Sequence, residues 1–442
     1  MSTTPSLRRL RDGWHRVPNA TGLGAVLLVC LALALVVRVL TDDLSAANSR
    51  HSGSLNLSGV IAVLFIVVAF VLLARERRGV LASTLAVIWL LIWTVVALHT
   101  SGASTETLRE GVRELSVVGL GVIVYNAQKL VTLPIAARMV QLMGIAPALL
   151  ALYQLATHTG LDVAGNVRAN GTFAHPNSAA MFFAIATVAT LWLYLDYGRR
   201  LFDALLVAIF AAALIATFSI DGLLTLTAML LVFGTLQPGS IRAKLVPAVV
   251  AGLVVLVFFA TPLGARRIAG ESSTSLRAAD RGETTSSLDT RLYRWKTLLP
   301  EWERSPVIGQ GLGTTTTAEG TSANPLNGLL PHNEYIRYLV ETGILGLAIL
   351  IAALAYLGRS LIRGWRATRN GSQEPFNAPA LGVVVVVGCL VNALADNTLL
   401  NSPTCYAATL IVASLLGNTR STVSVAHAKV SLPASGLRTS RP

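Results

Sequence analysis

The residues best suited to chemistry lie in one long polar stretch of this chain, from Leu263 to about Tyr335, which carries Arg291, Arg294 and His332. A guanidinium stays protonated and presents a fork of N–H donors that suits phosphate oxygens. An imidazole can take a proton from a hydroxyl near neutral pH. The stretch therefore predicts a site that binds an anionic group and activates a hydroxyl.

The spacing of the two arginines supports this interpretation. On a helix, Arg291 and Arg294 are three residues apart and share a face, so both could address one anion. For any single arginine, a solvated surface or contact with lipid phosphates is the alternative. Arg291 is the strongest candidate. Four further arginines lie in a Ser, Thr, Gly and Ala-rich piece, residues 264–287, and are more typical of a flexible surface: Arg266, Arg267, Arg277 and Arg281.

A second polar loop precedes an apolar run and carries Arg168. Its Gly171 and Pro176 are typical of a tight turn that enters a helix, and Asn177 could cap that helix. His175 in the same loop is interpreted as an interface residue, as is His99.

The elements that must position these residues are membrane helices. The chain has 53% hydrophobic and only 13% charged residues, and its mean hydropathy is +0.63, far from the averages of soluble domains. The apolar runs of this chain are long enough to cross a bilayer, and a chain can do so only as helices or closed barrels. We expect an all-α polytopic protein with about 12 transmembrane helices, near residues 22–40, 57–74, 80–98, 113–130, 135–156, 177–195, 201–219, 222–236, 245–262, 337–357, 379–396 and 403–417.

The distribution of basic residues predicts the orientation. Lys and Arg collect in one alternate set of loops, which marks that set as cytoplasmic. Both termini then face the cytoplasm. The expected divisions are a basic cytoplasmic tail (1–21), helices 1–9 (22–262), a large extracytoplasmic loop with the site motifs (263–336), helices 10–12 (337–417) and a disordered cytoplasmic tail (418–442).

The formal net charge of +13 follows mainly from this inside bias. It predicts contact with anionic membrane lipids and no nucleic-acid partner. The three cysteines, Cys30, Cys389 and Cys405, fall in or beside expected spans and indicate no metal site. We therefore expect no metal and no cofactor.

A helix is expected just after Pro331, and its polar residues could serve the site. Asn333 follows His332, and Glu334, Arg337 and Glu341 recur at helical spacing. An ordinary polar cap on a membrane helix is the alternative interpretation of His332.

These stretches together resemble the O-antigen ligase and polymerase family of integral membrane glycosyltransferases. The resemblance rests on the order of the motifs and covers most of the chain. The matching residues are Arg168, Gly171, Phe173, Pro176, Asn177, Arg291, Trp295, Pro306, Gly309, Gly311, Gly313, His332, Asn333, Glu341 and Gly343. The family acts in bacterial cell-envelope polysaccharide biosynthesis, with glycans linked to undecaprenyl diphosphate or a similar polyprenyl diphosphate, on the outer side of the cytoplasmic membrane.

The resemblance implies roles for the candidate residues. His332 would be the base, Arg291 and Arg168 would hold the donor's diphosphate, and Arg294 would assist. Further substrate-binding residues would be Asn177, Asn333, Arg337 and Glu341. The implied reaction transfers a glycan to a hydroxyl on a glycan or glycolipid acceptor, with inversion and without a metal.

One position departs from the family pattern. The family usually carries Ser-Arg-Gly at the outer turn after the seventh span, and this chain has Ser219, Ile220, Asp221 and Gly222 there. An Asp in place of that arginine is expected to repel a diphosphate, so another arginine would have to compensate.

Three alternatives stay open. Within the family, a lipid-linked glycan as acceptor would make a polymerase and any other acceptor a ligase. A secondary transporter or a flippase for lipid-linked oligosaccharides would also have twelve spans and cytoplasmic termini. Asp221 would suit a family member that binds a glycolipid without transferring its glycan.

Overall fold

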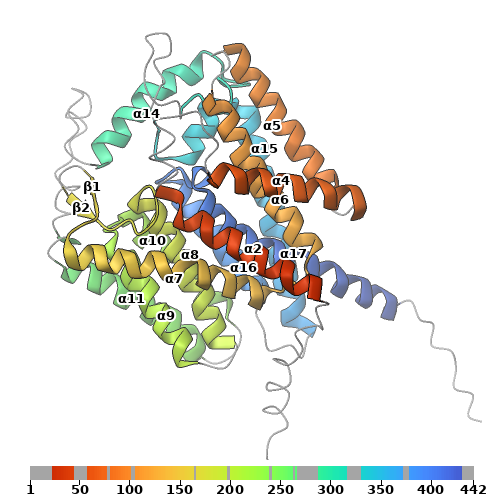
Figure 1. Ribbon diagram of the computed structural model, residues 1–442, viewed down its shortest axis with the longest axis vertical. Coiled ribbons are helices and arrows are strands. Elements are labelled where there is room, and N and C mark those ends of the chain that lie inside the picture. Colours follow the sequence, from red (N-terminus) through yellow and green to blue (C-terminus); the bar gives the residue numbers. More distant parts are fainter. Residues whose placement is uncertain are drawn as a thin grey trace, which may run out of the picture.

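The computed structural model describes residues 22–43, 57–76, 80–100, 105–163, 166–196, 200–237, 241–261, 264–265, 287–315, 330–371 and 378–430. These residues are almost entirely helical, with one short hairpin (Figure 1). The helices are α2 (Gly22–Leu40), α4 (Leu57–Glu76), α5 (Val80–Thr100), α6 (Thr105–Asn126), α7 (Leu133–Thr157), α8 (Pro176–Asp196), α9 (Leu201–Ala216), α10 (Ile220–Leu236), α11 (Ile241–Ala260), α14 (Ser287–Glu303), α15 (Glu334–Gly371), α16 (Ala378–Ala393) and α17 (Ser402–Val430). The hairpin pairs β1 (Leu161–Val163) with β2 (Asn166–Arg168), and a 3-10 turn, η1, spans Thr398–Leu400.

Most of the expected spans are present as apolar helices. Five described helices are long and apolar enough to cross a membrane, namely Leu57–Arg75, Ser83–Thr100, Leu133–Thr157, Pro176–Asp196 and Glu334–Arg366. Six shorter apolar helices coincide with the other spans: Gly24–Leu40, Leu201–Ala216, Ile220–Leu236, Lys244–Ala260, Ala378–Ala393 and Ser402–Leu416. The chain is therefore an all-helical, multi-pass membrane protein, as its composition predicts.

The fourth expected span, 113–130, differs from the structure. Helix α6 covers Thr105–Asn126, so it begins earlier, and its first half is charged. Glu110 on that half is only 1% exposed. Its carboxylate lies against the guanidinium of Arg337 on α15, at 3.0 Å. A buried charge is tolerable when an opposite charge and hydrogen bonds compensate for lost water, and local apolarity does not reveal such a helix.

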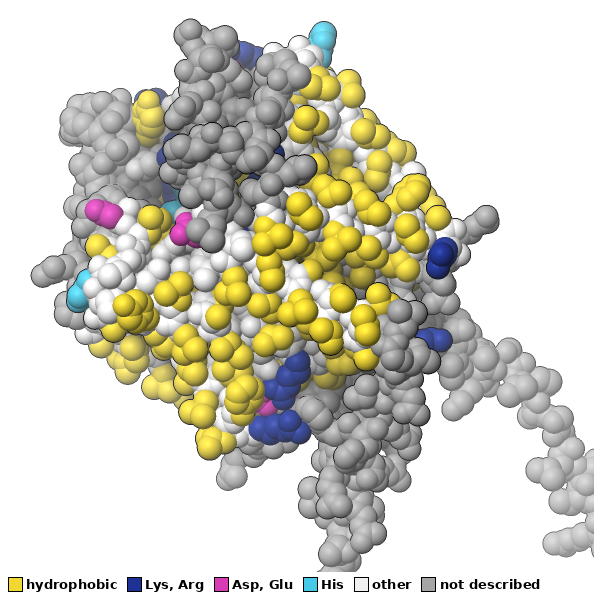
Figure 2. Space-filling view, in the orientation of Figure 1, with side chains coloured by type: hydrophobic (Ala, Val, Ile, Leu, Met, Phe, Trp, Pro, Cys, Tyr) yellow, Lys and Arg dark blue, Asp and Glu magenta, His cyan; other side chains and the backbone are white. Residues whose placement is uncertain are grey.

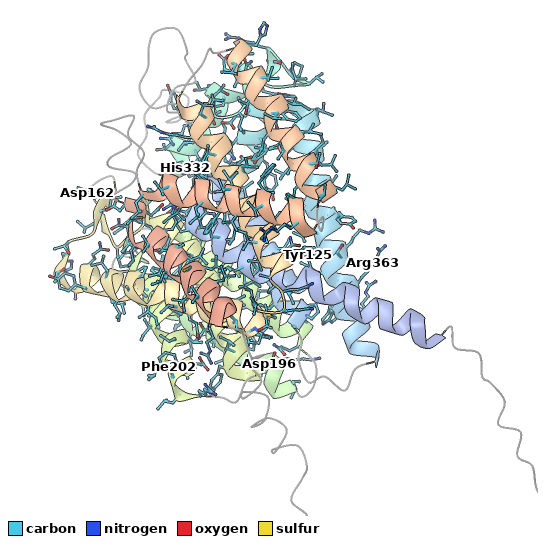
Figure 3. The ribbon with its side chains drawn as sticks, turned by 45° about the vertical axis from the view of Figure 1, so that its right-hand side comes forward. Tyr125, Asp162, Asp196, Phe202, His332 and Arg363 are labelled. Atoms are coloured by element: carbon cyan, nitrogen blue, oxygen red, sulfur yellow. The ribbon has the colours of Figure 1, made fainter. Side chains whose placement is uncertain are left out.

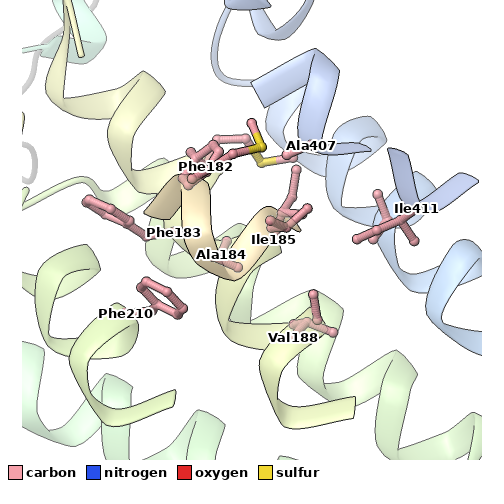
Figure 4. Packing of buried hydrophobic residues seen from close by; sticks show 14 of the residues in the cluster. Phe182, Phe183, Ala184, Ile185, Val188, Phe210, Ala407 and Ile411 are labelled. Atoms are coloured by element: carbon pink, nitrogen blue, oxygen red, sulfur yellow. The ribbon is translucent and has the colours of Figure 1, made fainter. Parts of the chain in front are cut away.

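The core is built around α8. In the most apolar stretch of α8, 83% of the residues are buried, whereas in the most apolar stretch of α5 only 22% are buried. Figure 4 shows Phe182 and Phe183 of α8 beside Phe210 of α9, with Ile411 of α17 on the other side. A helix that is apolar all round is suited to this inner position.

The outer face carries apolar side chains. Figure 2 shows them as a broad band across the molecule, with basic side chains below and to the right of the band and others near the top. Phe70 and Leu81, for example, are 72% and 74% exposed. An apolar face of this extent is unfavourable in water but suited to lipid tails.

Two features of the helices bear on the site. Helix α14 lies within the expected large loop and crosses one end of the molecule (Figure 1). Helix α15 is broken at Gly343, whose φ is 63° and ψ is −172°. Separately, α17 continues to Val430, so residues 418–430, expected in the disordered tail, are helical.

Several chain segments that are expected to face outward lie together at the end of the molecule that α14 crosses. The hydroxyl of Thr172, ahead of α8, donates to the carbonyl of Val39 at the end of α2, at 2.8 Å. The N–H of Ala169 donates to the carbonyl of Ala216, at the end of α9, at 3.2 Å. In Figure 3, His332 lies toward the upper left.

Candidate active site

Arg168 sits at the end of β2 and is buried, with 3% of its surface exposed. Its Nε donates to the carbonyl of Thr217 at 2.7 Å. One of its terminal nitrogens, Nη2, donates to Oδ1 of Asn177 at 2.7 Å. The guanidinium is thus fixed between the end of α9 and the start of α8.

Asn177 has a different role from the helix cap expected for it. Helix α8 begins at Pro176, and Asn177 lies in its first turn. Its Oδ1 accepts from Arg168 and also from the hydroxyl of Ser219, at 3.1 Å. Its Nδ2 donates to Asp221 at 3.4 Å. Asn177 therefore links the arginine to the α9–α10 turn.

The α9–α10 turn is tight. Phe218 has a φ of 47°, which is uncommon for a bulky residue. Ser219 follows and caps α10, because its hydroxyl accepts the N–H of Gly222 at 3.2 Å. The strained turn places Asp221 in the first turn of α10, beside Asn177.

Asp221 is paired with Arg291. The guanidinium of Arg291 on α14 donates from Nη1 to Oδ1 of Asp221, at 3.3 Å, and from Nη2 to Oδ2. The side chains are 14% and 8% exposed, respectively. In the ligand-free structure, the guanidinium of Arg291 therefore compensates the negative charge of Asp221, which is expected to repel a diphosphate.

Arg294 lies one turn further along α14 and contacts a different partner. Its Nη1 donates to the carbonyl of Leu330 at 2.7 Å. Nearby, Nε1 of Trp295 donates to the carbonyl of Pro331 at 2.7 Å. Burial, and then the charge of Arg291, lowers the pKa of Arg294. Helix α14 thus holds the segment that leads into His332.

His332 lies in a left-handed conformation with a φ of 48°, just before α15. Its Nδ1 is 2.9 Å from Oδ1 of Asp396, which follows α16. Burial alone would raise the pKa of Asp396, but the hydrogen bond and charge of His332, with a contribution from His175, hold that pKa below its usual value. An ionised carboxylate only accepts hydrogen bonds, so Nδ1 of His332 carries the proton and, in the neutral ring, Nε2 is the basic nitrogen.

His175 is the second imidazole of the site. Its ring centroid lies 6.2 Å from that of His332. Its Nδ1 accepts the N–H of Asn177 at 3.1 Å. Burial lowers the pKa of His175 to about 4, and the positive charge of Arg168 adds to this, against the opposing effect of Asp396. A neutral ring that accepts at Nδ1 must carry its proton at Nε2.

Asn333 caps the next helix. Its Oδ1 accepts the N–H of Ile336 at 3.1 Å, and its Nδ2 donates to the carbonyl of Leu394 at 2.9 Å. These two bonds tie the start of α15 to the end of α16. They therefore keep His332 beside Asp396.

Arg337 and Glu341 lie in a separate buried ion cluster between α6 and α15. Both are 0% exposed. Nη1 of Arg337 is 3.0 Å from Glu341 and 3.0 Å from Glu110. Nε of Arg337 donates to Glu334 at 2.7 Å. In this arrangement their charges stabilise one another and fix the first turns of α15.

The glycine motif lies against the break in α15. The N–H of Gly311 donates to the carbonyl of Glu341 at 2.8 Å, and that of Ile344 donates to Pro306 at 2.9 Å. A Cβ on Gly309 would lie 2.5 Å from the backbone nitrogen of Gly343. These glycines allow two backbones to touch.

The structure thus brings together Arg168, Asn177, Arg291 and His332 of the predicted site residues, with Arg294 and Asn333 supporting them. Asp396, Asp221 and His175 complete the group. Asp396 was missed because it is 64 residues from His332. The available signal was a carboxylate at the last residue of an expected span, where ionisable groups are costly and often functional. In the described residues, no group of three or more His, Cys, Asp or Glu side chains could hold a metal ion.

Part of the chain matches a known family. Residues 204–351 match the model of the O-Antigen ligase family. The matched segment contains Asp221, Arg291 and His332, whereas Arg168 and Asp396 lie outside it. None of the curated proteins matches the chain in a sequence search. The resemblance predicted from the motifs is confirmed over this segment, which is about a third of the chain.

Proposed function

We propose that this protein, whose residues 204–351 carry the O-antigen ligase domain, transfers a glycan from a polyprenyl-diphosphate carrier to a hydroxyl of a glycan or glycolipid acceptor. One observation carries the proposal: a histidine oriented by a carboxylate, His332 with Asp396, shares a site with arginines from two other elements. A base and anion-binding groups are what this transfer requires.

The reaction begins at the acceptor. Nε2 of His332 takes the proton of the acceptor hydroxyl while its oxygen forms a bond to the anomeric carbon of the donor sugar. The bond between that carbon and the diphosphate oxygen breaks, and its electron pair leaves with the diphosphate. Attack opposite the leaving group inverts the anomeric centre. The proton on His332 is then released to water.

Charge develops on the diphosphate as it leaves. Arg291 and Arg168 are the donors for its oxygens, and Arg294 contributes positive charge one turn away on α14. His175, with a proton at Nε2, adds a neutral donor on the same side as His332. Asn177, Asn333, Arg337 and Glu341 act by positioning, since each bonds to residues or backbone around the site.

The orientation follows from the basic loops. With Lys and Arg on the cytoplasmic side, the site faces outward, and the carrier's lipid tail would lie between the spans that border α14. Both termini would face the cytoplasm. The acceptor decides between ligase and polymerase, and either acceptor would use the same residues.

The test uses purified protein in lipid with an undecaprenyl-diphosphate-linked glycan. Release of undecaprenyl diphosphate should require an added acceptor, and the new glycosidic bond should have the opposite anomeric configuration to the donor. Release without acceptor, or retention of configuration, would contradict the mechanism. Movement of intact donor across sealed vesicles without any transfer would instead favour a flippase.

A further inference from the structure

Asp221 binds the guanidinium of Arg291, which the proposed function assigns to the donor's diphosphate. Both terminal nitrogens of Arg291 donate to its two carboxylate oxygens. A carboxylate and a phosphate present similar pairs of oxygens to a guanidinium fork. The contact that Asp221 makes with Arg291 is therefore the contact that the proposed function assigns to the diphosphate.

Asp221 is the fixed partner in this pair. It lies in the first turn of α10, and its Oδ2 also accepts from Asn177 at 3.4 Å. The start of α10 packs closely on α8, where a side chain on Gly222 would collide with Ala180. Arg291, in contrast, reaches the pair through a long side chain on α14. We therefore expect that, when the pair opens, Asp221 stays beside Asn177 and the Arg291 side chain moves.

We propose that Asp221 is a built-in competitor of the diphosphate: it holds Arg291 in the ligand-free protein and exchanges it with the donor during each turnover. The inference rests on the proposed function. After transfer, the released carrier still bears a diphosphate, and re-formation of the Asp221–Arg291 pair displaces it. Asp221 thereby limits how tightly either lipid diphosphate is held.

This account predicts a gain of affinity when the competitor is removed. A residue that only anchored α14 would show the reverse, because its loss would free the helix and weaken the site. The sign of the change in affinity therefore separates exchange from anchoring. Binding can be measured without any transfer reaction, which also separates the inference from the proposed function.

The probe is farnesyl diphosphate, a short and soluble prenyl diphosphate, titrated into the full chain in lipid nanodiscs. Asp221→Asn keeps the size of the side chain and should bind the probe about tenfold more tightly than wild type, which is a typical worth for one charged hydrogen-bonded contact. Asp221→Ala should shift affinity in the same direction. Asp162→Asn is the matched control, because Asp162 is an exposed carboxylate on β1. The affinity of this variant for farnesyl diphosphate should equal that of wild type.

A second background completes the test. In the Arg291→Ala variant, the additional Asp221→Asn change should alter the affinity for farnesyl diphosphate less than twofold, because the guanidinium that this change would release is absent. Unchanged or weaker binding by both Asp221 variants overturns the inference while leaving the proposed function standing. An equal gain in the Arg291→Ala background also overturns it. Absence of binding by wild type and every variant overturns the proposed function and the inference together.

Discussion

The two histidines of the site have opposite tautomers, although their rings are neighbours. His175 accepts a backbone N–H at Nδ1, and His332 faces a carboxylate with Nδ1. The first ring therefore presents an N–H at Nε2, and the second presents a lone pair there in its neutral form. In the proposed reaction, His332 would therefore remove the proton and His175 would donate a hydrogen bond.

Asp396 should act through His332. In Asp396→Asn, the amide no longer requires the proton of His332 to be at Nδ1, so the basic nitrogen is no longer fixed at Nε2. We expect kcat to fall by about 10²–10⁴-fold, the range seen when a base loses its orienting carboxylate. Affinity for farnesyl diphosphate should change less than twofold, because Asp396 does not contact the arginines. Steady-state kinetics and the binding titration together check this, and a kcat within twofold of wild type would rule the role out.

His175 should make the protein less stable in acid. Its pKa is lowered to about 4 in the folded protein, below its ordinary value near 6.5, so the unfolded chain binds more protons between these values. Its contribution to stability is complete above about pH 6.5 and is lost as the pH falls toward about 4. In His175→Gln this loss should be smaller by about 1–3 kcal/mol. Apparent unfolding temperatures of both proteins from pH 7 to 4 measure it, and parallel pH curves would contradict it.

Sequence reasoning selected charged or proton-accepting side chains in loops that are expected to face outward. Arg168, Arg291 and His332 are candidates because their types suit phosphate and hydroxyl chemistry. The partners Asp221 and Asp396 were not recognised, because a carboxylate's role depends on which cation faces it after folding. Asp221 was expected to repel, and in the structure it pairs with Arg291.

At the scale of elements, the backbone of α15 packs at its break directly against the backbone of residues 306–313, and we call this contact the joint. The segment from Pro306 to Gly313 exchanges hydrogen bonds with α15 on both sides of Gly343. Trp93 of α5 adds a bond from Nε1 to the carbonyl of Ile308, at 3.0 Å. The first turns of α15, and with them the segment of His332, are held in place by this joint.

Two glycines on α15 provide a matched test of the joint. Gly343→Ala would add a side chain at a φ of 63° and against the backbone of Val307, so we expect a loss of about 2–4 kcal/mol in stability and loss of transfer activity. Gly358→Ala meets nothing within 4 Å and should instead be neutral or stabilising by up to about 1 kcal/mol. Thermal unfolding in detergent compares them. Equal behaviour of the two variants would show that the joint is unimportant.

The helices themselves were largely predictable, because apolar runs of bilayer length admit few alternatives. The break at Gly343 and the length of α17 were not, since neither leaves a periodic signal. Helix α6 began earlier than expected because its charged turns are stabilised by Arg337, which is 227 residues from Glu110. Local hydropathy cannot reveal ion pairs between residues that are this far apart in the sequence.

At the scale of the whole molecule, the site occupies one end of a bundle whose outer face is apolar. Asp162 and His332 lie toward the same side in Figure 3, and Asp196 and Arg363 lie away from them. The basic residues predict that the first side faces outward. A carrier lipid could then remain in the bilayer while its diphosphate reaches the site.

Cysteine labelling in intact cells tests this orientation. In a background with Cys30, Cys389 and Cys405 replaced by Ala, Asp162→Cys should react with a membrane-impermeant maleimide. Arg363→Cys, an exposed position on α15 near a basic loop, should react only after the cells are opened. The reverse pattern would place the site in the cytoplasm and refute an outer-face reaction.

The most direct measurement of the central claim follows acceptor-dependent release of undecaprenyl diphosphate by the purified protein in lipid. We predict that His332→Ala lowers the rate by at least about 10²-fold, the usual contribution of a general base, and leaves farnesyl diphosphate binding intact. His99→Ala, a matched change at an exposed histidine of α5, should release the carrier at the wild-type rate. Undiminished release by His332→Ala would show that the base lies elsewhere and that the site described around His332 and Asp396 does not perform the transfer.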